Sequence, residues 1–224
     1  MPFKDSGCGL VGSGFARIYD TLEVVERPAE AAAVTPVPKT LKSVGGFSQQ
    51  ISALVTQKAT ATAREPGLAP SASVTATGHS LGAALATLYT MDNARNDQVS
   101  NPLLCTFGSP RVGDSTFVAS FNNLGLTSWR IANVPDIVPY LPPAFLGFAH
   151  IDVLQSFSSI GKVKSSPYCW HSLATYLSLI DTSARPSPDC QLTADLARHS
   201  AATSLSVPAG TGAVNITINV CHRG

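Results

Sequence analysis

The sequence predicts an α/β fold in which a mostly parallel sheet is flanked by helices. Short runs of β-branched or apolar residues alternate with stretches of helical periodicity, the order expected of parallel strands joined by crossover helices. The chain has 224 residues, 44% of them apolar and 13% charged, so it can bury one sizeable core. No internal repeat is visible, and we expect a single domain over residues 1–224.

The first part of the chain is expected to supply helices and their connections. Ile51, Leu54 and Val55 recur at i, i+3 and i+4, which is the spacing of one helix face. Clustered prolines and glycines mark the loops between such stretches. The predicted elements are a helix within 11–25, a surface loop or insertion over 26–46, a helix over 47–63 and a linker over 66–72.

The remainder of the chain carries the expected sheet. Asp114 offers a helix cap and Gly125 a helix stop on either side of one predicted helix. The residues from 182 to 224 form a tail with a possible last strand at 214–220. The other predicted elements are strands over 73–77, 103–107 and 128–134, helices over 81–95, 115–124 and 170–180, and a proline-rich loop over 138–147.

Charge and hydropathy exclude several classes of protein. The net charge of +1 indicates neither a nucleic-acid partner nor an anionic membrane surface. No apolar run reaches the roughly 18 residues that a transmembrane helix needs. The first residues lack the apolar centre of a signal peptide, so we expect the leader of an exported protein to be absent from this sequence.

The five cysteines leave the compartment open but favour an extracellular location. An odd number cannot all pair within one chain. Cys105 lies in an apolar run and is expected to be a buried free thiol. Those in loop-like or terminal stretches, where disulfides are possible, are Cys8, Cys169, Cys190 and Cys221.

The segment GHSLG lies where a predicted strand gives way to a predicted helix. A sharp strand-to-helix turn lifts a serine hydroxyl above the end of a sheet, and it crowds the residues two before and two after the serine. Ser80, between Gly78 and Gly82, fits this nucleophile elbow. The helix N-terminus would direct backbone N–H groups at developing negative charge. The alternative is a Gly/Ser turn in which Ser80 only caps the helix.

A serine nucleophile needs a histidine base and a carboxylate that orients it. In α/β-hydrolases the acid and then the histidine follow the serine along the chain. Asp136 is favoured because it directly follows a predicted strand, whereas Asp114 and Asp181 lie at helix ends. Among the histidines, the residues alone favour His171 only weakly over His150.

Six segments together resemble the class 3 lipases, a branch of the α/β-hydrolase superfamily. They are VGSGFARIY, TATGHSLGAALATL, CTFGSPRVGDSTF, WRIANVPDIVPYLP, FAH and CWHSLATYLSLID. They cover most of residues 9–181, and the last two are most similar to plant-type and related bacterial members, which include sn-1-type phospholipases and acylglycerol lipases. The resemblance implies an α/β-hydrolase-like fold and hydrolysis of lipid esters, without a metal or organic cofactor.

The resemblance also implies a role for individual residues. His79 matches a histidine that packs beside the nucleophile, and His150 matches one that is usually structural. The catalytic positions that it implies are Ser80 as nucleophile, Asp136 as triad acid, His171 as base and the backbone N–H of Leu81 as an oxyanion donor.

The chain departs from the family pattern near its start. Family members usually carry further strands, a lid and a Phe-Arg-Gly-Thr-like motif, which supplies a second oxyanion donor, upstream of the segment that begins at Val11. Only ten residues precede Val11 here, so we expect an N-terminally incomplete hydrolase. Loss of one oxyanion donor costs about 10²–10³ in turnover in a known hydrolase.

The sequence therefore predicts a serine carboxylic-ester hydrolase of lipase type that acts on acylglycerols or related lipid esters, with a lipid–water interface as one place where it could act. The alternatives are an sn-1-type phospholipase, an aryl or feruloyl esterase, or an inactive hydrolase remnant that binds lipid or protein. The glycines within residues 7–12 fit a dinucleotide motif, but too few residues precede them to form its strand. The loop over 138–148 could line an acyl pocket, with ordinary loop packing as the alternative.

Overall fold

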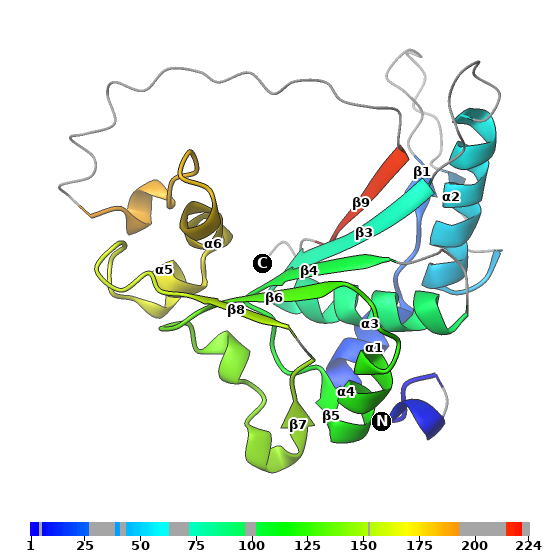
Figure 1. Ribbon diagram of the computed structural model, residues 1–224, viewed down its shortest axis with the longest axis horizontal. Helices are drawn as coiled ribbons and strands as arrows, with labels where there is room; N and C mark the ends of the chain where they lie inside the picture. The colour runs from blue at the N-terminus through cyan, green and yellow to red at the C-terminus, as the bar shows by residue number, and fades with distance from the viewer. Residues whose placement is uncertain are drawn as a thin grey trace.

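The computed structural model of the protein places a mainly parallel sheet between helices (Figure 1). It describes residues 1–4, 6–26, 39–40, 44–62, 72–96, 102–151, 153–192 and 214–220.

Five strands form the central sheet, in the order β8–β6–β4–β3–β9, and every neighbouring pair is parallel. The register pairs Thr75 with Leu103 and Leu104 with Ser128. This arrangement confirms the predicted α/β class and its parallel sheet. The strands are β3 (Ala72–His79), β4 (Leu103–Phe107), β6 (Ser128–Asn133), β8 (Leu154–Phe157) and β9 (Val214–Val220).

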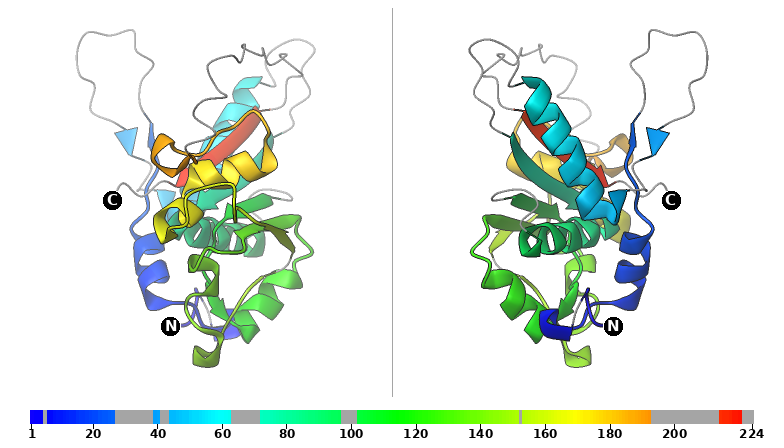
Figure 2. Two further views of the ribbon diagram at one scale, coloured as in Figure 1. Left: turned by 90° about the vertical axis from the view of Figure 1, so that its left-hand side faces the viewer. Right: turned by 90° about the vertical axis from the view of Figure 1, so that its right-hand side faces the viewer.

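Helix α3 (Leu81–Arg95) packs along β3 and β4, and α1 (Ser13–Asp20) and α2 (Phe47–Thr62) pack against α3 (Figures 1 and 2). Every residue of α3 from Gly82 to Asn93 is buried. Alanines at positions 83, 84 and 86 keep the helix close to the strands, and aromatic side chains of α1 and α2 complete this core. The predicted helix over 81–95 is confirmed at both ends.

The predicted cap and stop of the next helix are also present. Asp114 precedes α4 (Ser115–Asn122), and its Oδ1 accepts a hydrogen bond of 2.8 Å from the backbone N–H of Phe117. Gly125 has a positive φ of 64° just beyond the helix. Beside α4, β5 (Gly113–Asp114) pairs antiparallel with β7 (Phe148–Ala149).

The predicted helix over 170–180 is wrong in one respect, because the structure divides this region into two helices. They are α5 (Pro167–His171) and α6 (Leu173–Ile180), and Ser172 between them is extended, with φ −61° and ψ 130°. His171 therefore ends a helix and does not begin one. Both helices lie beyond the end of the sheet at which the strands finish (Figure 1).

The sequence did not predict β8, which is an edge strand whose side chains are mostly exposed and lack apolar alternation. Cys105 is half-buried, whereas a buried thiol was expected. At the start of the predicted 26–46 loop, β1 (Val25–Glu26) pairs antiparallel with β2 (Lys39–Thr40), which lies within that loop. Residues 27–38 and 41–43 of that loop, and the predicted linker apart from Ala72, lie outside the described residues.

The expected last strand is present as β9, which pairs in parallel with β3 at one edge of the sheet. The described part of the chain contains no helix that is both long and apolar enough to span a membrane. Short 3-10 helices complete the described structure: η1 (Ser6–Cys8), η3 (Val138–Tyr140), η4 (Ala144–Leu146) and η5 (Pro188–Cys190).

Candidate active site

A tight turn joins β3 to α3 and contains Ser80 alone. Strand β3 ends at His79 and α3 begins at Leu81. Ser80 has φ 58° and ψ −125°, a backbone conformation that L-residues rarely adopt. A Cβ at Gly78 would lie 2.2 Å from the carbonyl oxygen of Gly82, so only glycine fits there. The turn therefore has the geometry that the GHSLG segment predicts.

The N-terminus of α3 lies immediately after Ser80. Leu81 is the first residue of the helix, so no helical carbonyl lies where it could accept a bond from the Leu81 N–H. The aligned peptide dipoles of a helix favour negative charge at this end. The site thus places a backbone donor beside the serine hydroxyl.

His171 connects Ser80 to Asp136 through two hydrogen bonds. The Nε2 atom of His171 lies 2.8 Å from Ser80 Oγ, and its Nδ1 lies 2.7 Å from Asp136 Oδ2. Because a carboxylate only accepts, Nδ1 carries the proton and Nε2 is free to accept the serine proton. Three residues from three separate segments of the chain therefore form one hydrogen-bonded series.

Asp136 lies three residues beyond the end of β6 and is 1% exposed. Its Oδ1 accepts a 3.0 Å bond from the backbone N–H of Val138, and its Oδ2 accepts a 2.6 Å bond from the hydroxyl of Tyr176. These donors compensate for the loss of water around the buried carboxylate.

Tyr176, on α6, was not identified from the sequence. Burial, followed by its hydrogen bond to Asp136, raises the pKa of the Tyr176 hydroxyl, so the group keeps its proton and acts as a donor. The backbone N–H of Asn133 donates to the same hydroxyl oxygen at 3.1 Å. No sequence signal predicted the contact between Tyr176 and Asp136. Tyr176 follows His171 by five residues, but the helix breaks at Ser172 between them, so helical spacing does not relate the two positions.

Gly108, just after β4, is a second residue that the sequence did not indicate. It has a positive φ of 56°, and a Cβ there would lie 3.2 Å from both Asp136 Oδ2 and His171 Cε1. A side chain at this position would press against both the imidazole of His171 and the carboxylate of Asp136. Glycine at this position therefore leaves room for their contact.

The two other histidines that were considered lie outside the hydrogen-bonded series. His79 donates from Nε2 to the backbone carbonyl of His171 at 2.7 Å, and the two rings lie 4.5 Å apart. Burial, and then the nearby His171, lower the pKa of His79. His150 donates from Nε2 to the carbonyl of Pro139 at 2.6 Å, and burial beside Arg130 lowers its pKa to about 4.

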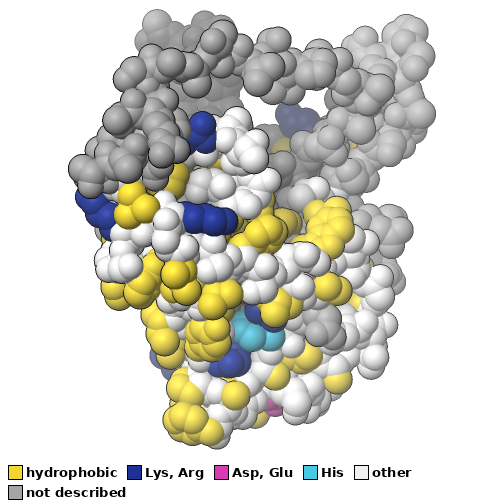
Figure 3. All heavy atoms as spheres, turned by 60° about the vertical axis from the view of Figure 1, so that its left-hand side comes forward, with side chains coloured by type: hydrophobic (Ala, Val, Ile, Leu, Met, Phe, Trp, Pro, Cys, Tyr) yellow, Lys and Arg dark blue, Asp and Glu magenta, His cyan; other side chains and the backbone are white. Residues whose placement is uncertain are grey.

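An apolar pocket of about 470 Å³ adjoins His171. Ile137 and Tyr168 on its rim are 56% and 67% exposed. Figure 3 shows exposed hydrophobic side chains gathered over part of the face that comes forward when the left-hand side of Figure 1 is turned toward the viewer. The lining residues are His79, Ile137, Val138, Pro167, Tyr168, His171, Ser172 and Leu173.

Only the start of the 138–148 loop reaches this pocket, through Val138. Phe145 and Leu146, farther along the loop, are exposed and do not line this pocket.

Of the side chains that the structure describes, no group of three or more His, Cys, Asp or Glu could hold a metal ion.

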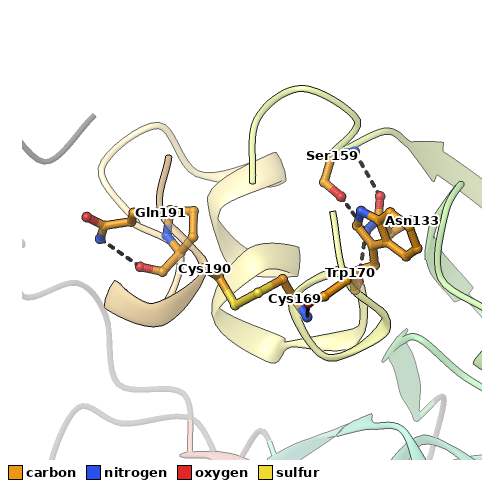
Figure 4. Close-up of a disulfide and its surroundings, with 8 residues drawn as sticks. Asn133, Ser159, Cys169, Trp170, Cys190 and Gln191 are labelled. Atoms are coloured by element: carbon orange, nitrogen blue, oxygen red, sulfur yellow. Dashed lines mark hydrogen bonds between the residues drawn. A yellow bond between two sulfur atoms is a disulfide. The ribbon is translucent and has the colours of Figure 1, made fainter. Parts of the chain in front are cut away.

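A disulfide between Cys169 and Cys190 holds α5 to the segment around η5 (Figure 4). Cys169 lies two residues before His171 and both cysteines are buried. Two of the four cysteines expected in loops therefore pair; Cys221 lies outside the described residues. Cys8 is buried in the main core.

The chain is similar to known proteins over part of its length. A sequence model of the family described as lipase (class 3) matches residues 2–146. A phospholipase A1-II 4 from Oryza sativa subsp. japonica is 40% identical over 118 residues, which cover 47% of this chain and 28% of that protein. A lipase from Rhizomucor miehei is 45% identical over 84 residues, which cover 36% of this chain and 23% of that protein.

The solved structure of lipase II from Rhizopus niveus is similar at a TM-score of 0.46 and 28% identity, and the match covers 66% of this chain and 44% of that one. The chain spans less than a third of the length of either curated relative.

Proposed function

Since this chain belongs to the class 3 lipase family, we propose that it hydrolyses carboxylic esters of lipids with Ser80 as nucleophile, His171 as base and Asp136 as the orienting acid. The observation that carries the proposal is the pair of hydrogen bonds from His171 to Ser80 Oγ and to Asp136 Oδ2. The strained turn at Ser80 adds support, because it exposes the hydroxyl beside a helix N-terminus.

The first half of the reaction forms an acyl-enzyme. Ser80 Oγ attacks the ester carbonyl carbon while its proton passes to His171 Nε2. Asp136 stabilises the imidazolium that results, and the Leu81 N–H donates to the oxyanion of the tetrahedral intermediate. The bond between the carbonyl carbon and the alcohol oxygen then breaks, and His171 returns the proton to the leaving alcohol.

The second half uses water in place of the serine. His171 takes a proton from a water molecule, whose oxygen attacks the acyl carbon. The second tetrahedral intermediate collapses, the bond to Ser80 Oγ breaks, and His171 protonates the serine. The products are a carboxylic acid and the free enzyme, and all protons and bonds balance without a cofactor.

The apolar pocket beside His171 supports a substrate with a hydrocarbon acyl group. Acylglycerols are the first candidate substrates. Phospholipids are a second candidate, because the similarity to a plant phospholipase A1 includes 40% identity over 118 residues. The Cys169–Cys190 disulfide supports an oxidising, extracellular-type compartment.

The test combines active-site labelling with hydrolysis. We expect a phosphonate ester probe to label the native protein once, and nitrophenyl esters to be hydrolysed. Ser80→Ala should abolish both, while its circular dichroism spectrum stays native. Ser115→Ala, an exposed position on α4, is the matched control and should behave like the native protein.

Hydrolysis that persists in Ser80→Ala would refute the assignment of the nucleophile. A native protein that is neither labelled nor active would instead favour the non-catalytic lipid- or protein-binding alternative. If the native protein is active, a series of nitrophenyl esters of increasing chain length, followed by triolein and phosphatidylcholine, separates aryl esterase, lipase and phospholipase activity.

A further inference from the structure

Asn133 is the last residue of β6, and its buried side chain joins two segments that meet beyond the sheet. Its Nδ2 donates 2.8 Å bonds to Ser159 Oγ and to the backbone carbonyl of Trp170 (Figure 4). Its Oδ1 accepts a 2.9 Å bond from the Ser159 N–H. The amide orientation is determined by its partners, because the Trp170 carbonyl can only accept and the Ser159 N–H can only donate.

The Trp170 carbonyl belongs to the residue immediately before His171. The helix that ends at His171 has only five residues, and extended backbone at Ser172 follows it. Such a short helix has little stability of its own. The position of the His171 ring therefore depends on the contacts that hold its neighbours, of which the Asn133 amide is one and the Cys169 disulfide another.

The backbone of Asn133 contacts the other side of the site. Its carbonyl accepts a 2.9 Å bond from the Asp136 N–H. Its N–H donates to the Tyr176 hydroxyl at 3.1 Å, and that hydroxyl donates to Asp136 Oδ2 at 2.6 Å. One residue thus has its side chain bonded to the segment that carries His171 and its main chain bonded to the segment that carries Asp136.

We propose that Asn133 is a positioning residue that sets the imidazole of His171 against the carboxylate of Asp136. The inference rests on the proposed function, because it assigns Asn133 to the alignment of that same triad. Asparagine suits the role since its planar amide offers two donors and one acceptor in fixed directions. Aspartate would place an oxygen against the Trp170 carbonyl, and an aliphatic side chain would leave three buried polar groups without this partner.

The experiment compares Asn133→Ala with Ser159→Ala. The first variant removes the bond to the Trp170 carbonyl, whereas the second removes only the Ser159 hydroxyl and keeps that bond. On a short-chain nitrophenyl ester, we expect Asn133→Ala to lower kcat by about 10²-fold, because a displacement of 1 Å can cost this much. Its KM should change little, and Ser159→Ala should keep a kcat close to the native value.

A spectroscopic readout tests alignment directly. The proton shared between His171 Nδ1 and Asp136 should give a far-downfield proton NMR resonance in the native protein. This resonance should be lost or broadened in Asn133→Ala and retained in Ser159→Ala. If Asn133→Ala fails to fold, Asn133→Leu, which nearly conserves volume and removes the same hydrogen bonds, carries the same two measurements.

A folded Asn133 variant with native kcat and a native resonance would overturn the inference. So would a change confined to KM, or an equal loss of kcat in Ser159→Ala. Failure of the proposed function is a separate outcome, because then the native protein itself would show neither phosphonate labelling nor hydrolysis.

Discussion

The carboxylate of Asp136 accepts hydrogen bonds from three groups although it is almost fully buried. The donors are His171 Nδ1, the Tyr176 hydroxyl and the Val138 N–H. A buried carboxylate with fewer donors would lack partners for its oxygen atoms, which costs free energy. The three donors therefore replace the water that burial removes from the carboxylate, and they hold it in place beside the imidazole of His171.

Replacement of Tyr176 by phenylalanine tests this arrangement at a single hydroxyl. The change removes one donor to Asp136 and leaves the Asn133 N–H without its acceptor. We expect the free energy of unfolding to fall by about 1–3 kcal/mol, the cost of unpaired buried polar groups, and ester turnover to slow. Urea denaturation and the kcat for a nitrophenyl ester would measure the two effects.

Tyr140→Phe is the matched control for that substitution. The Tyr140 side chain is 52% exposed, and its hydroxyl donates a long 3.5 Å hydrogen bond to the Val134 carbonyl. Its removal should change neither quantity appreciably. Equal effects of the two substitutions would show that the Tyr176 hydroxyl has no special role beside Asp136.

At the scale of elements, α5 depends on contacts from outside the helix. Ser166 caps its start by accepting a 3.2 Å bond from the Cys169 N–H, and the disulfide ties Cys169 to Cys190. His171 is the last residue of this helix. The element that carries the proposed base is thus held by covalent and polar restraints more than by its own length.

The double variant Cys169→Ser and Cys190→Ser tests the covalent restraint. Loss of a native disulfide in small domains costs about 2–5 kcal/mol, so we expect a comparable fall in the free energy of unfolding. The kcat should fall as well, because α5 loses one of its restraints. Cys105→Ser, at a half-buried thiol outside the disulfide, is the control, and its stability should stay closer to native.

Treatment of the native protein with a reductant offers a second measurement of the same effect. Reduction under denaturing conditions, followed by refolding, should reproduce the stability of the double variant. A double variant as stable and as active as the native protein would contradict the role assigned to this disulfide.

At the scale of the whole molecule, His150 couples stability to pH. Burial, followed by the positive charges of Arg130 and Arg111, lowers its pKa from the ordinary value of 6.5 to about 4, although the bond to Pro139 opposes the shift. The unfolded chain therefore binds more protons than the folded protein between these values. The stability that neutral His150 contributes is complete above pH 6.5 and is lost as the pH falls towards about 4.

We expect the free energy of unfolding to decrease over that pH interval, as measured by urea denaturation at several pH values. In His150→Gln, which keeps a side-chain N–H donor but cannot be protonated, the decrease should be smaller. Identical pH dependence in the two proteins would show that His150 is not the group responsible.

Much of the fold could be predicted because its signals are local. The GHSLG turn, the alanine-rich helix after it and the Asp114 cap all depend on residues close together in the chain, and the structure places β3, α3 and α4 accordingly. The edge strand β8 was not predicted because most of its side chains are exposed, so its sequence lacks the alternation of apolar and polar residues that marks a half-buried strand. The break at Ser172 was missed because the sequence around it keeps helical periodicity.

The sequence by itself determined the strand-to-helix turn at Ser80 and the position of Asp136 just after a strand. It also determined the alternation of strands and helices along the chain that produces a parallel sheet. Each follows from conformational preferences over a few residues. Only the tertiary structure decided that His171 bonds both partners, that Cys169 pairs with Cys190, and that Gly108, Asn133 and Tyr176 surround the carboxylate. These contacts join segments distant in the chain, and the packing of the sheet against its helices brings them together.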